Sequence, residues 1–302
     1  MCYNHVMNWD DIKYFLAVAR TGSVSAASKR LNVDHTTVAR RITHLEKTIG
    51  SVLFVREQKG YQLTEAGGRL TAHAEAMEGN SLSLQNEMSD ETLGVTGSVR
   101  LATPEALGSQ FLSRFWSIFR RHHPGIEIEL VADTRPLSLS KREADIAIAL
   151  ARPKHGRLVS SKVGEYSLKL YGSPAYLKDH PPIYRTRDLA GHEFISYVDD
   201  LIPVEQLRLL ERTLNNPRVV LRSTNVTGQT NATVDGVGLA LLPCFLADRT
   251  QGLVPILPDL INITRDLWLL THEDIRPLAR IDATMQFLAT LIKSERKTLM
   301  GN

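Results

Sequence analysis

The chain has 302 residues, a length that favours two or three domains over one. Hydrophobic residues make up 43% and charged residues 23%, which is a globular composition and excludes disordered, fibrous and membrane classes. The formal net charge is only +3, so any nucleic-acid surface has to be a local patch. Cys2 and Cys244 lie far apart and form no metal-ligand pair or disulfide framework. No apolar run reaches about 18 residues, and we expect a cytoplasmic protein without membrane contact, metal or cofactor.

The first 50 residues predict three short helices. Apolar residues recur at three- and four-residue spacing over residues 12–19, and Gly22 ends that helix. Ser23 or Ser25 can cap a shorter helix that ends at Asn32. Asp34 is the expected capping residue of a third helix that runs to Gly50. Two helices joined by so tight a turn are typical of a helix-turn-helix.

The third predicted helix has two contrasting sides. Its apolar stripe is formed by Val38, Ile42, Leu45 and Ile49. Nearly opposite, at 100° per residue, lie Thr36, Arg40, Thr43 and Lys47. An ordinary solvated face is one interpretation of this outer side, and a DNA-binding surface is the other. The stretch "VLFVREQKGYQLT" that follows predicts a β-hairpin around Lys59-Gly60, and a helix-turn-helix followed by a basic hairpin favours a winged helix-turn-helix on DNA.

The order and spacing of "DIKYFLAVARTGSVSAASKRLNVDHTTVARRITHLEKTIGSVLFVREQKGYQLTEAG" resemble the DNA-binding domain of the LysR-type transcriptional regulators over residues 8–67. The resemblance implies that residues 24–43 form the helix-turn-helix and that its second helix enters the major groove. Side chains of its first turn then contact base edges and Arg40 reaches guanine. Arg41, Arg56 and Lys59 hold phosphates. The predicted DNA-binding residues are His35, Thr36, Thr37, Arg40, Arg41, Arg56 and Lys59. We expect His44 and Lys47 to be solvated.

Residues 67–94 predict a linker helix with a heptad seam. Leu70, Ala74, Met77, Ser81, Leu84 and Met88 recur at four- and three-residue spacing. Such a helix, about 40 Å long, is unstable with its seam exposed. The seam is buried either by a second copy or by packing within one monomer. The resemblance implies an antiparallel dimer contact here, paired half-sites in double-stranded DNA, and a tetramer built as two dimers.

After residue 94 short apolar runs alternate with helical stretches, which predicts an α/β domain. We expect two Rossmann-like subdomains, with the chain crossing near residues 164–168 and returning near 263–267, an arrangement that resembles periplasmic binding proteins. The predicted domains are an all-α winged helix-turn-helix over 1–66, a linker helix over 67–94 and an effector domain over 95–302. Subdomain I comprises 95–166 and 266–302, and subdomain II comprises 167–265.

Two strand ends predict an effector site. Thr103 and Pro104 suit the start of a helix, and Asn225-Val226-Thr227 precede another. Plain helix starts are the simpler interpretation, but two helix N-termini facing a cleft would clamp a carboxylate. We therefore expect a small-molecule effector of unknown identity, for which the clamp favours an anionic group, although Glu105 nearby would oppose an anion. With the loops that the family resemblance adds, the predicted effector-binding residues are Thr103, Pro104, Thr134, Leu150, Arg152, Tyr197, Asn225, Val226 and Thr227.

Catalytic motifs are missing from the sequence. It has no Gly-x-Ser-x-Gly elbow, phosphate loop, dinucleotide fingerprint or helical His pair with metal-binding spacing. We therefore predict a transcriptional regulator whose promoter binding or activation responds to a small-molecule effector, and no enzyme. Residues 95–302 alone favour a solute-binding protein, which the winged domain and the absence of an export signal oppose. An enzyme with a regulatory N-terminal domain is a third alternative.

Overall fold

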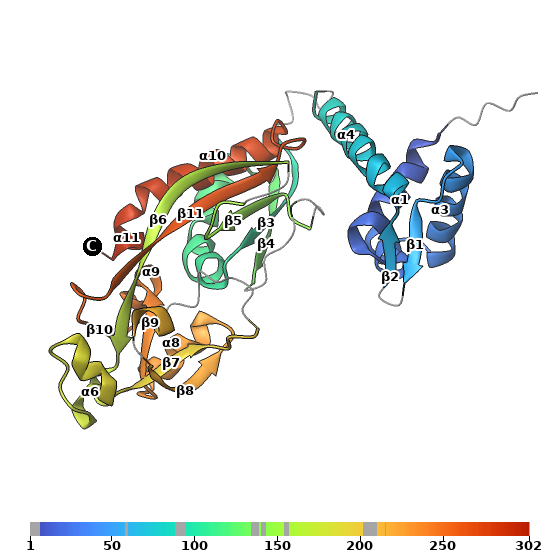
Figure 1. The fold of residues 1–302 in the computed structure, drawn as a ribbon. Coiled ribbons are helices and arrows are strands. Elements are labelled where there is room, and N and C mark those ends of the chain that lie inside the picture. The colour runs from blue at the N-terminus through green and yellow to red at the C-terminus, as the bar shows by residue number, and fades with distance from the viewer. Residues whose placement is uncertain are drawn as a thin grey trace, which may run out of the picture. The chain divides into compact units, whose positions relative to one another are not determined.

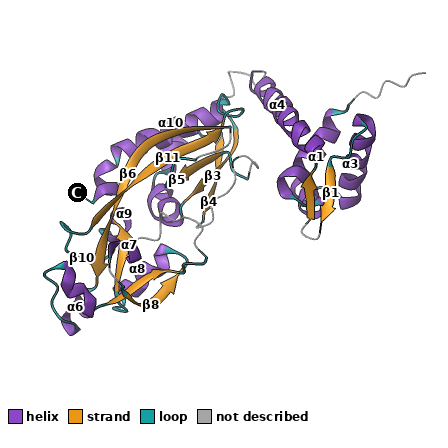
Figure 2. Cartoon of the chain, viewed as in Figure 1, coloured by secondary structure: helices purple, strands orange, loops and turns teal. Residues whose placement is uncertain are grey.

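The computed structural model describes residues 7–57, 60–87, 95–133, 139, 143–153, 157–201, 210–214 and 216–301. The chain divides into two compact units, residues 1–90 and 91–302, and each is described by itself. Figure 1 labels their helices and strands, and Figure 2 separates them by type. No helix in the described part of the chain combines the length and the apolar composition needed to cross a membrane.

The N-terminal unit is a winged helix-turn-helix. It contains α1 (Trp9–Thr21), α2 (Val24–Leu31), α3 (His35–Ile49), the antiparallel strands β1 (Phe54–Glu57) and β2 (Gly60–Leu63), and α4 (Glu65–Glu87). The Ser23 hydroxyl accepts from the Ala26 N–H and caps α2, as predicted. Asp34 stands at the N-cap position of α3, but its side chain makes no capping hydrogen bond, so that part of the prediction was wrong.

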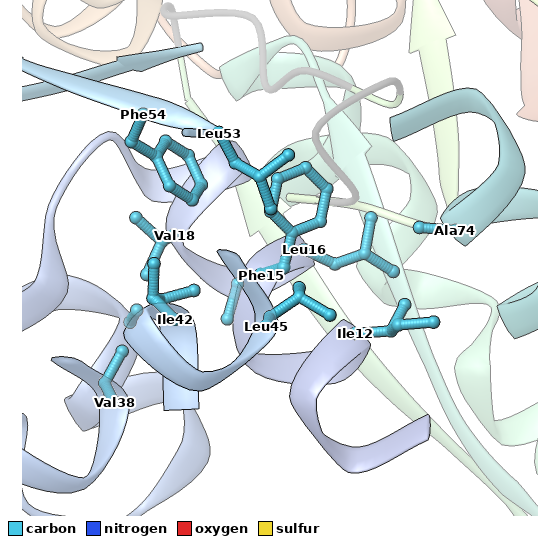
Figure 3. Close-up of a cluster of buried hydrophobic side chains, with 12 residues drawn as sticks. Ile12, Phe15, Leu16, Val18, Val38, Ile42, Leu45, Leu53, Phe54 and Ala74 are labelled. Carbon is cyan, nitrogen blue, oxygen red and sulfur yellow. The ribbon is translucent and has the colours of Figure 1, made fainter. Parts of the chain in front are cut away.

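One apolar core holds these elements together (Figure 3). Phe15 and Leu16 of α1 belong to the same buried cluster as Val38 and Leu45 of α3, and all four residues are at most 1% exposed. Phe54 of the wing packs on Phe15, with ring centroids 5.2 Å apart. Burying each such side chain contributes roughly 1.5–3 kcal/mol, so the core fixes which side of α3 faces outward.

The wing lies directly against the turn after α1. Gly60 has φ +125°, and a Cβ there would lie 2.4 Å from the Gly22 carbonyl oxygen. The Tyr61 N–H donates to that same oxygen at 2.8 Å. Only glycine tolerates both the backbone conformation and the close approach, which explains the glycine at this end of the hairpin.

The C-terminal unit is an α/β structure on one mixed sheet. The described strands are β3 (Gly97–Thr103), β4 (Ile126–Ala132), β5 (Ile146–Ala149), β6 (Leu158–Gly172), β7 (Glu193–Tyr197), β8 (Arg218–Ser223), β9 (Leu239–Pro243), β10 (Val254–Ile256) and β11 (Asn262–His272). Their order is β4-β3-β5-β11-β6-β9-β7-β8, with β10 on β6.

The sheet has two parallel halves. Strands β4, β3 and β5 pair in parallel, as do β9, β7 and β8. The long antiparallel strands β6 and β11 lie between them and pair with both halves. The residues predicted to cross, 164–168 and 263–267, lie in these two strands, and Tyr166 pairs with Arg265. The predicted fold class is confirmed, with the two halves sharing a continuous sheet.

Helices cover this sheet. The longer ones are α5 (Trp116–His122), α8 (Val226–Val234) and α10 (Ala279–Ser294). The short ones are α6 (Pro174–Asp179), α7 (Leu210–Thr213), α9 (Cys244–Ala247) and α11 (Arg296–Met300), with 3-10 turns at Leu112–Arg114 and Thr186–Gly191. Helix α10 runs along β6 (Figure 1), and a Cβ on Gly164 of β6 would lie 2.5 Å from the Ile292 side chain.

Candidate DNA-binding surface and effector site

Helix α3 turns its predicted base-reading residues outward. Val38, Ile42 and Leu45 are 0%, 6% and 0% exposed, whereas His35, Thr36 and Arg40 are exposed and Thr37 is half-buried. The burial of one stripe forces the other side of the helix to project from the unit. Donors, acceptors and methyl groups of the first turn therefore face away from the protein, as base readout requires.

Arg41, which was predicted to contact phosphate, has a partner for its guanidinium within the unit. Its Nη1 donates to Oδ1 of Asp11 on α1 at 3.0 Å, and its guanidinium lies 5.7 Å from the centre of the Tyr14 ring. His44 was predicted to be solvated, and its side chain is 62% exposed, while its Nδ1 lies 2.7 Å from Asp11 Oδ2. Asp11 is 1% exposed, so its charge needs partners. Both residues tie α3 to α1, a long-range pairing that helical periodicity does not reveal.

Of the two wing residues predicted to hold phosphate, one lies within the described part of the chain. Arg56 lies on β1, opposite Tyr61, and is exposed. Lys59 lies outside the described residues. An exposed guanidinium on a hairpin is suited to hold a phosphate without reading sequence.

The heptad seam of α4 is divided between two environments. Ala74 is fully buried in the core of the N-terminal unit, and Leu70 packs against it. Met77, one step further along the seam, is 39% exposed. The side chains of Leu84 and Met88 lie outside the described residues. The first part of the seam therefore packs within the monomer, and Met77 is available to a second copy.

The first predicted effector-binding helix end does not have the expected form. Thr103 is 5% exposed and its hydroxyl has no hydrogen-bond partner, so it caps no helix. Beyond Pro104 the chain soon enters a π-helix, Leu107–Phe111, and a Cβ on Gly108 would lie 2.2 Å from Thr103 Oγ1. The threonine hydroxyl is thus enclosed by this segment, and the predicted cap was wrong.

The second helix end is a true N-terminus, and its donors already have an anionic partner. Asn225 caps α8 by accepting from the Gly228 N–H at 2.7 Å. Glu105 reaches it from the other half of the sheet: Oε2 accepts from the Val226 N–H at 3.2 Å, and Oε1 accepts from the Thr227 hydroxyl at 2.8 Å. The sequence placed Glu105 near the site but did not predict that it would take the place of the expected anion.

The other predicted effector residues have varied surroundings. Leu150 is buried, whereas Arg152 is exposed and lies 5.7 Å from the Trp268 ring centre. Tyr197 borders a hollow of about 20 Å³, and burial, with Tyr166 and Glu105 nearby, raises its pKa. Its hydroxyl therefore stays protonated near neutral pH and can donate. Thr134 lies outside the described residues.

The predicted effector-binding residues did not include the other side chains around that hollow. They are Leu168, Ile195, Ser196, Leu210, Gln229 and Leu241, drawn from β6, β7, α7, α8 and β9. No local motif marks them, because they converge only when the sheet forms. Within the described ranges, no group of three or more His, Cys, Asp or Glu side chains is arranged to hold a metal ion.

A winged helix-turn-helix unit joined to a two-halved α/β unit defines a ligand-responsive DNA-binding regulator. The chain belongs to the LysR family of bacterial transcriptional regulators. Residues 9–68 match the family model described as bacterial regulatory helix-turn-helix protein, lysR family, and residues 93–292 match the LysR substrate binding domain. The predicted family is thereby confirmed.

Individual relatives agree with this assignment. The chain is 29% identical to the Mau operon transcriptional activator of Paracoccus denitrificans, over 91% of this chain and 93% of that protein. It is 27% identical to the transcriptional regulator PtxR of Pseudomonas aeruginosa, over 84% and 83%. Its fold is similar to that of full-length LysG from Corynebacterium glutamicum with bound effector Arg, with a TM-score of 0.60, 20% identity and coverage of 93% and 99%.

The protein is therefore a DNA-binding transcriptional regulator with an effector-binding domain. Because residues 9–68 match a helix-turn-helix of the lysR family, the alternative of a solute-binding protein is disfavoured. The named relatives are regulators of transcription, which favours that role over the enzyme alternative as well.

Proposed function

We propose that α3 reads base edges in the major groove through His35, Thr36, Thr37 and Arg40, while Arg56 and Lys59 hold phosphates. The exposure of His35, Thr36 and Arg40, opposite the buried stripe of α3, is the observation that carries the proposal. Arg41 supports the surface indirectly, through its pairing with Asp11. The protein acts on double-stranded DNA and hence, in a bacterial cell, in the cytoplasm.

Arg40 provides the direct test. A binding site is first selected from random DNA with the full chain, and affinity is then measured by fluorescence anisotropy for that site and for random sequence. Arg40→Ala should weaken the selected site by roughly 5- to 150-fold, the equivalent of ~1–3 kcal/mol for one bidentate base contact, and change random DNA little. Lys47→Ala, an exposed cation further along α3, is the matched control. Equal losses on both DNAs for Arg40→Ala would reject its base-reading role.

The wing is tested by salt dependence. Arg56→Ala should weaken selected and random DNA to a similar extent and reduce the slope of log affinity against log salt by about 1, because one released counterion is lost. An unchanged slope would show that Arg56 touches no phosphate.

A dimer through α4 would place two winged units on paired half-sites, and two dimers would form a tetramer. The proposed domain boundaries are 1–66, 67–94 and 95–302, with 95–166 and 266–302 as one subdomain and 167–265 as the other.

The exposed side chain of Met77 supports the dimer contact through α4. Met77→Glu should shift the sedimentation of the full chain toward the monomer, whereas Val52→Glu, at a 61% exposed apolar side chain, should not. Unchanged sedimentation of Met77→Glu would place the dimer contact elsewhere.

The effector site lies between the two halves of the α/β unit, around Glu105, Tyr197 and the start of α8. An effector with different affinities for two arrangements of these halves would shift their equilibrium and so change promoter binding. A thermal-shift screen of metabolites tests this, because a ligand of the folded state raises its melting temperature. A stabilising metabolite that leaves the DNA footprint unchanged would reject the coupling.

A further inference from the structure

Glu105 joins the two halves of the α/β unit at the proposed effector site. It lies just beyond β3, and its carboxylate meets the Val226 N–H at 3.2 Å and the Thr227 hydroxyl at 2.8 Å in the first turn of α8. The Ser109 hydroxyl also contacts its Oε1, at 3.3 Å. One carboxylate therefore accepts hydrogen bonds from both halves of the α/β unit.

The donors that Glu105 occupies are those best suited to an anionic ligand. A helix N-terminus attracts negative charge through its free N–H groups and the helix dipole. In α8 the Gly228 N–H is taken by Asn225 and the Val226 N–H by Glu105. A ligand anion at this turn would compete with a carboxylate that is already bound and would be repelled by it.

A ligand that carries hydrogen-bond donors is attracted to this turn rather than repelled. A carboxylate oxygen has capacity for more than one donor, so an ammonium or amidinium group can join Glu105 without displacing it. The Tyr197 hydroxyl, held in its protonated form by burial and by its neighbours, adds no negative charge. The immediate surroundings of Glu105 therefore favour positive charge.

We propose that Glu105 sets the charge preference of the effector site, disfavouring anionic groups at the start of α8 and favouring groups that carry positive charge. The inference rests on the proposed effector site between the two halves. It reverses the anion clamp that the two strand ends alone predict, because Glu105, which follows the first strand end, binds the helix start that follows the second.

Hydrogen exchange of the full chain, measured by mass spectrometry on peptides from α8, tests the inference with sulfate as the probe. Sodium chloride at matched ionic strength is the reference. In Glu105→Gln, sulfate should slow hydrogen exchange in the first turn of α8. The sulfate concentration that gives half of this effect should be at least about tenfold lower than in the unmodified protein, because one neighbouring charge changes an ionic equilibrium by about tenfold or more. Glu105→Ala should behave alike. Glu127→Gln removes an exposed carboxylate from β4 and should match the unmodified protein.

The outcomes separate this inference from the proposed site. Equal half-maximal concentrations in Glu105→Gln and the unmodified protein would overturn the charge preference and leave the site standing. No sulfate protection of α8 in any variant, Glu105→Gln and Glu105→Ala included, would show that the start of α8 binds no anion even without the carboxylate; it would overturn the inference and leave the proposed site to the thermal-shift screen. Exchange of the amides of β6 and β11, measured in the same experiment, should be the same for all variants and verifies that the α/β unit of each has folded.

Discussion

Arg20 on α1 and Glu78 on α4 form a two-point ion pair. Nη2 lies 2.7 Å from Oε2, and Nη1 donates to Oε1 at 3.1 Å. The Arg20 side chain is only 8% exposed and that of Glu78 is 23% exposed. The pair lies next to Met77 and beyond buried Ala74, so it holds the linker helix on the winged unit up to the proposed dimer contact.

Glu78→Gln should destabilise the packing of α4 on α1. A buried guanidinium that loses its partner costs 3–5 kcal/mol, and partial exposure of Glu78 together with Glu75 at 4.0 Å reduces this to about 2 kcal/mol. Exchange of the slowest amides of α1 measures the loss. Glu65→Gln breaks the exposed Arg69–Glu65 pair of the same helix and should cost under ~0.5 kcal/mol. Equal effects of the two variants would contradict a structural role for Arg20–Glu78.

Two adjacent glycines at the start of α4 should respond oppositely to alanine. A Cβ on Gly67 would lie 2.2 Å from the Leu53 carbonyl oxygen, whereas a Cβ on Gly68 meets nothing within 4 Å. Gly67→Ala should cost ~1–3 kcal/mol by overpacking, and Gly68→Ala should stabilise by ~0.5–1 kcal/mol through helix propensity. Thermal melts followed by circular dichroism give both values. Stabilisation by Gly67→Ala would show that the backbone moves away freely.

Asp11 should matter far more than its neighbour Asp10. Asp11→Asn removes the buried charge that Arg41 and His44 share, and we expect a loss of ~1.5–3 kcal/mol in unfolding free energy. DNA affinity should fall too, because α3 is then less firmly held on α1. Asp10→Asn touches only an exposed pair with Lys13 at 3.4 Å and should cost under ~0.5 kcal/mol. Urea unfolding and anisotropy measure the two effects, and an Asp11→Asn variant as stable as Asp10→Asn would refute the clamp.

Buried His192 should make the α/β unit less stable in acid. Its Nδ1 lies 3.2 Å from the Tyr176 hydroxyl, and burial, with His180 nearby, lowers its pKa. The folded state thus binds fewer protons than the unfolded chain once the pH falls below about 6.5, so the free energy of unfolding decreases as the pH falls through that range.

Urea unfolding between about pH 5 and pH 7.5 tests this slope. His192→Gln should flatten the dependence on pH, whatever its effect on absolute stability. His122→Gln alters an exposed histidine on α5 and should keep the full slope. Parallel profiles for His192→Gln and the unmodified protein would assign the acid sensitivity to other groups.

Local patterns in the sequence determined the elements of both units. The stripe of Val38, Ile42 and Leu45 predicted which side of α3 is buried, because a helix repeats every 3.6 residues and apolar side chains seek the core. Ser23 was one of two candidates for the cap of α2, and Asn225 was placed at a helix start, for a similar reason, since a capping bond spans only two or three residues. The outward position of Arg40 and the α/β nature of residues 95–302 follow from the same short-range rules.

Only the tertiary structure decided which charges meet. Asp11 pairs with residues 30 and 33 positions away, Arg20 with Glu78 at 58, and Glu105 with Thr227 at 122. These partners depend on how helices and sheet halves pack, and ion pairs carry no sequence periodicity that would announce them. The outline of a DNA-binding regulator was therefore readable from the chain, whereas the Arg41–Asp11 pair and the contact of Glu105 with the start of α8 emerged only when distant segments came into contact.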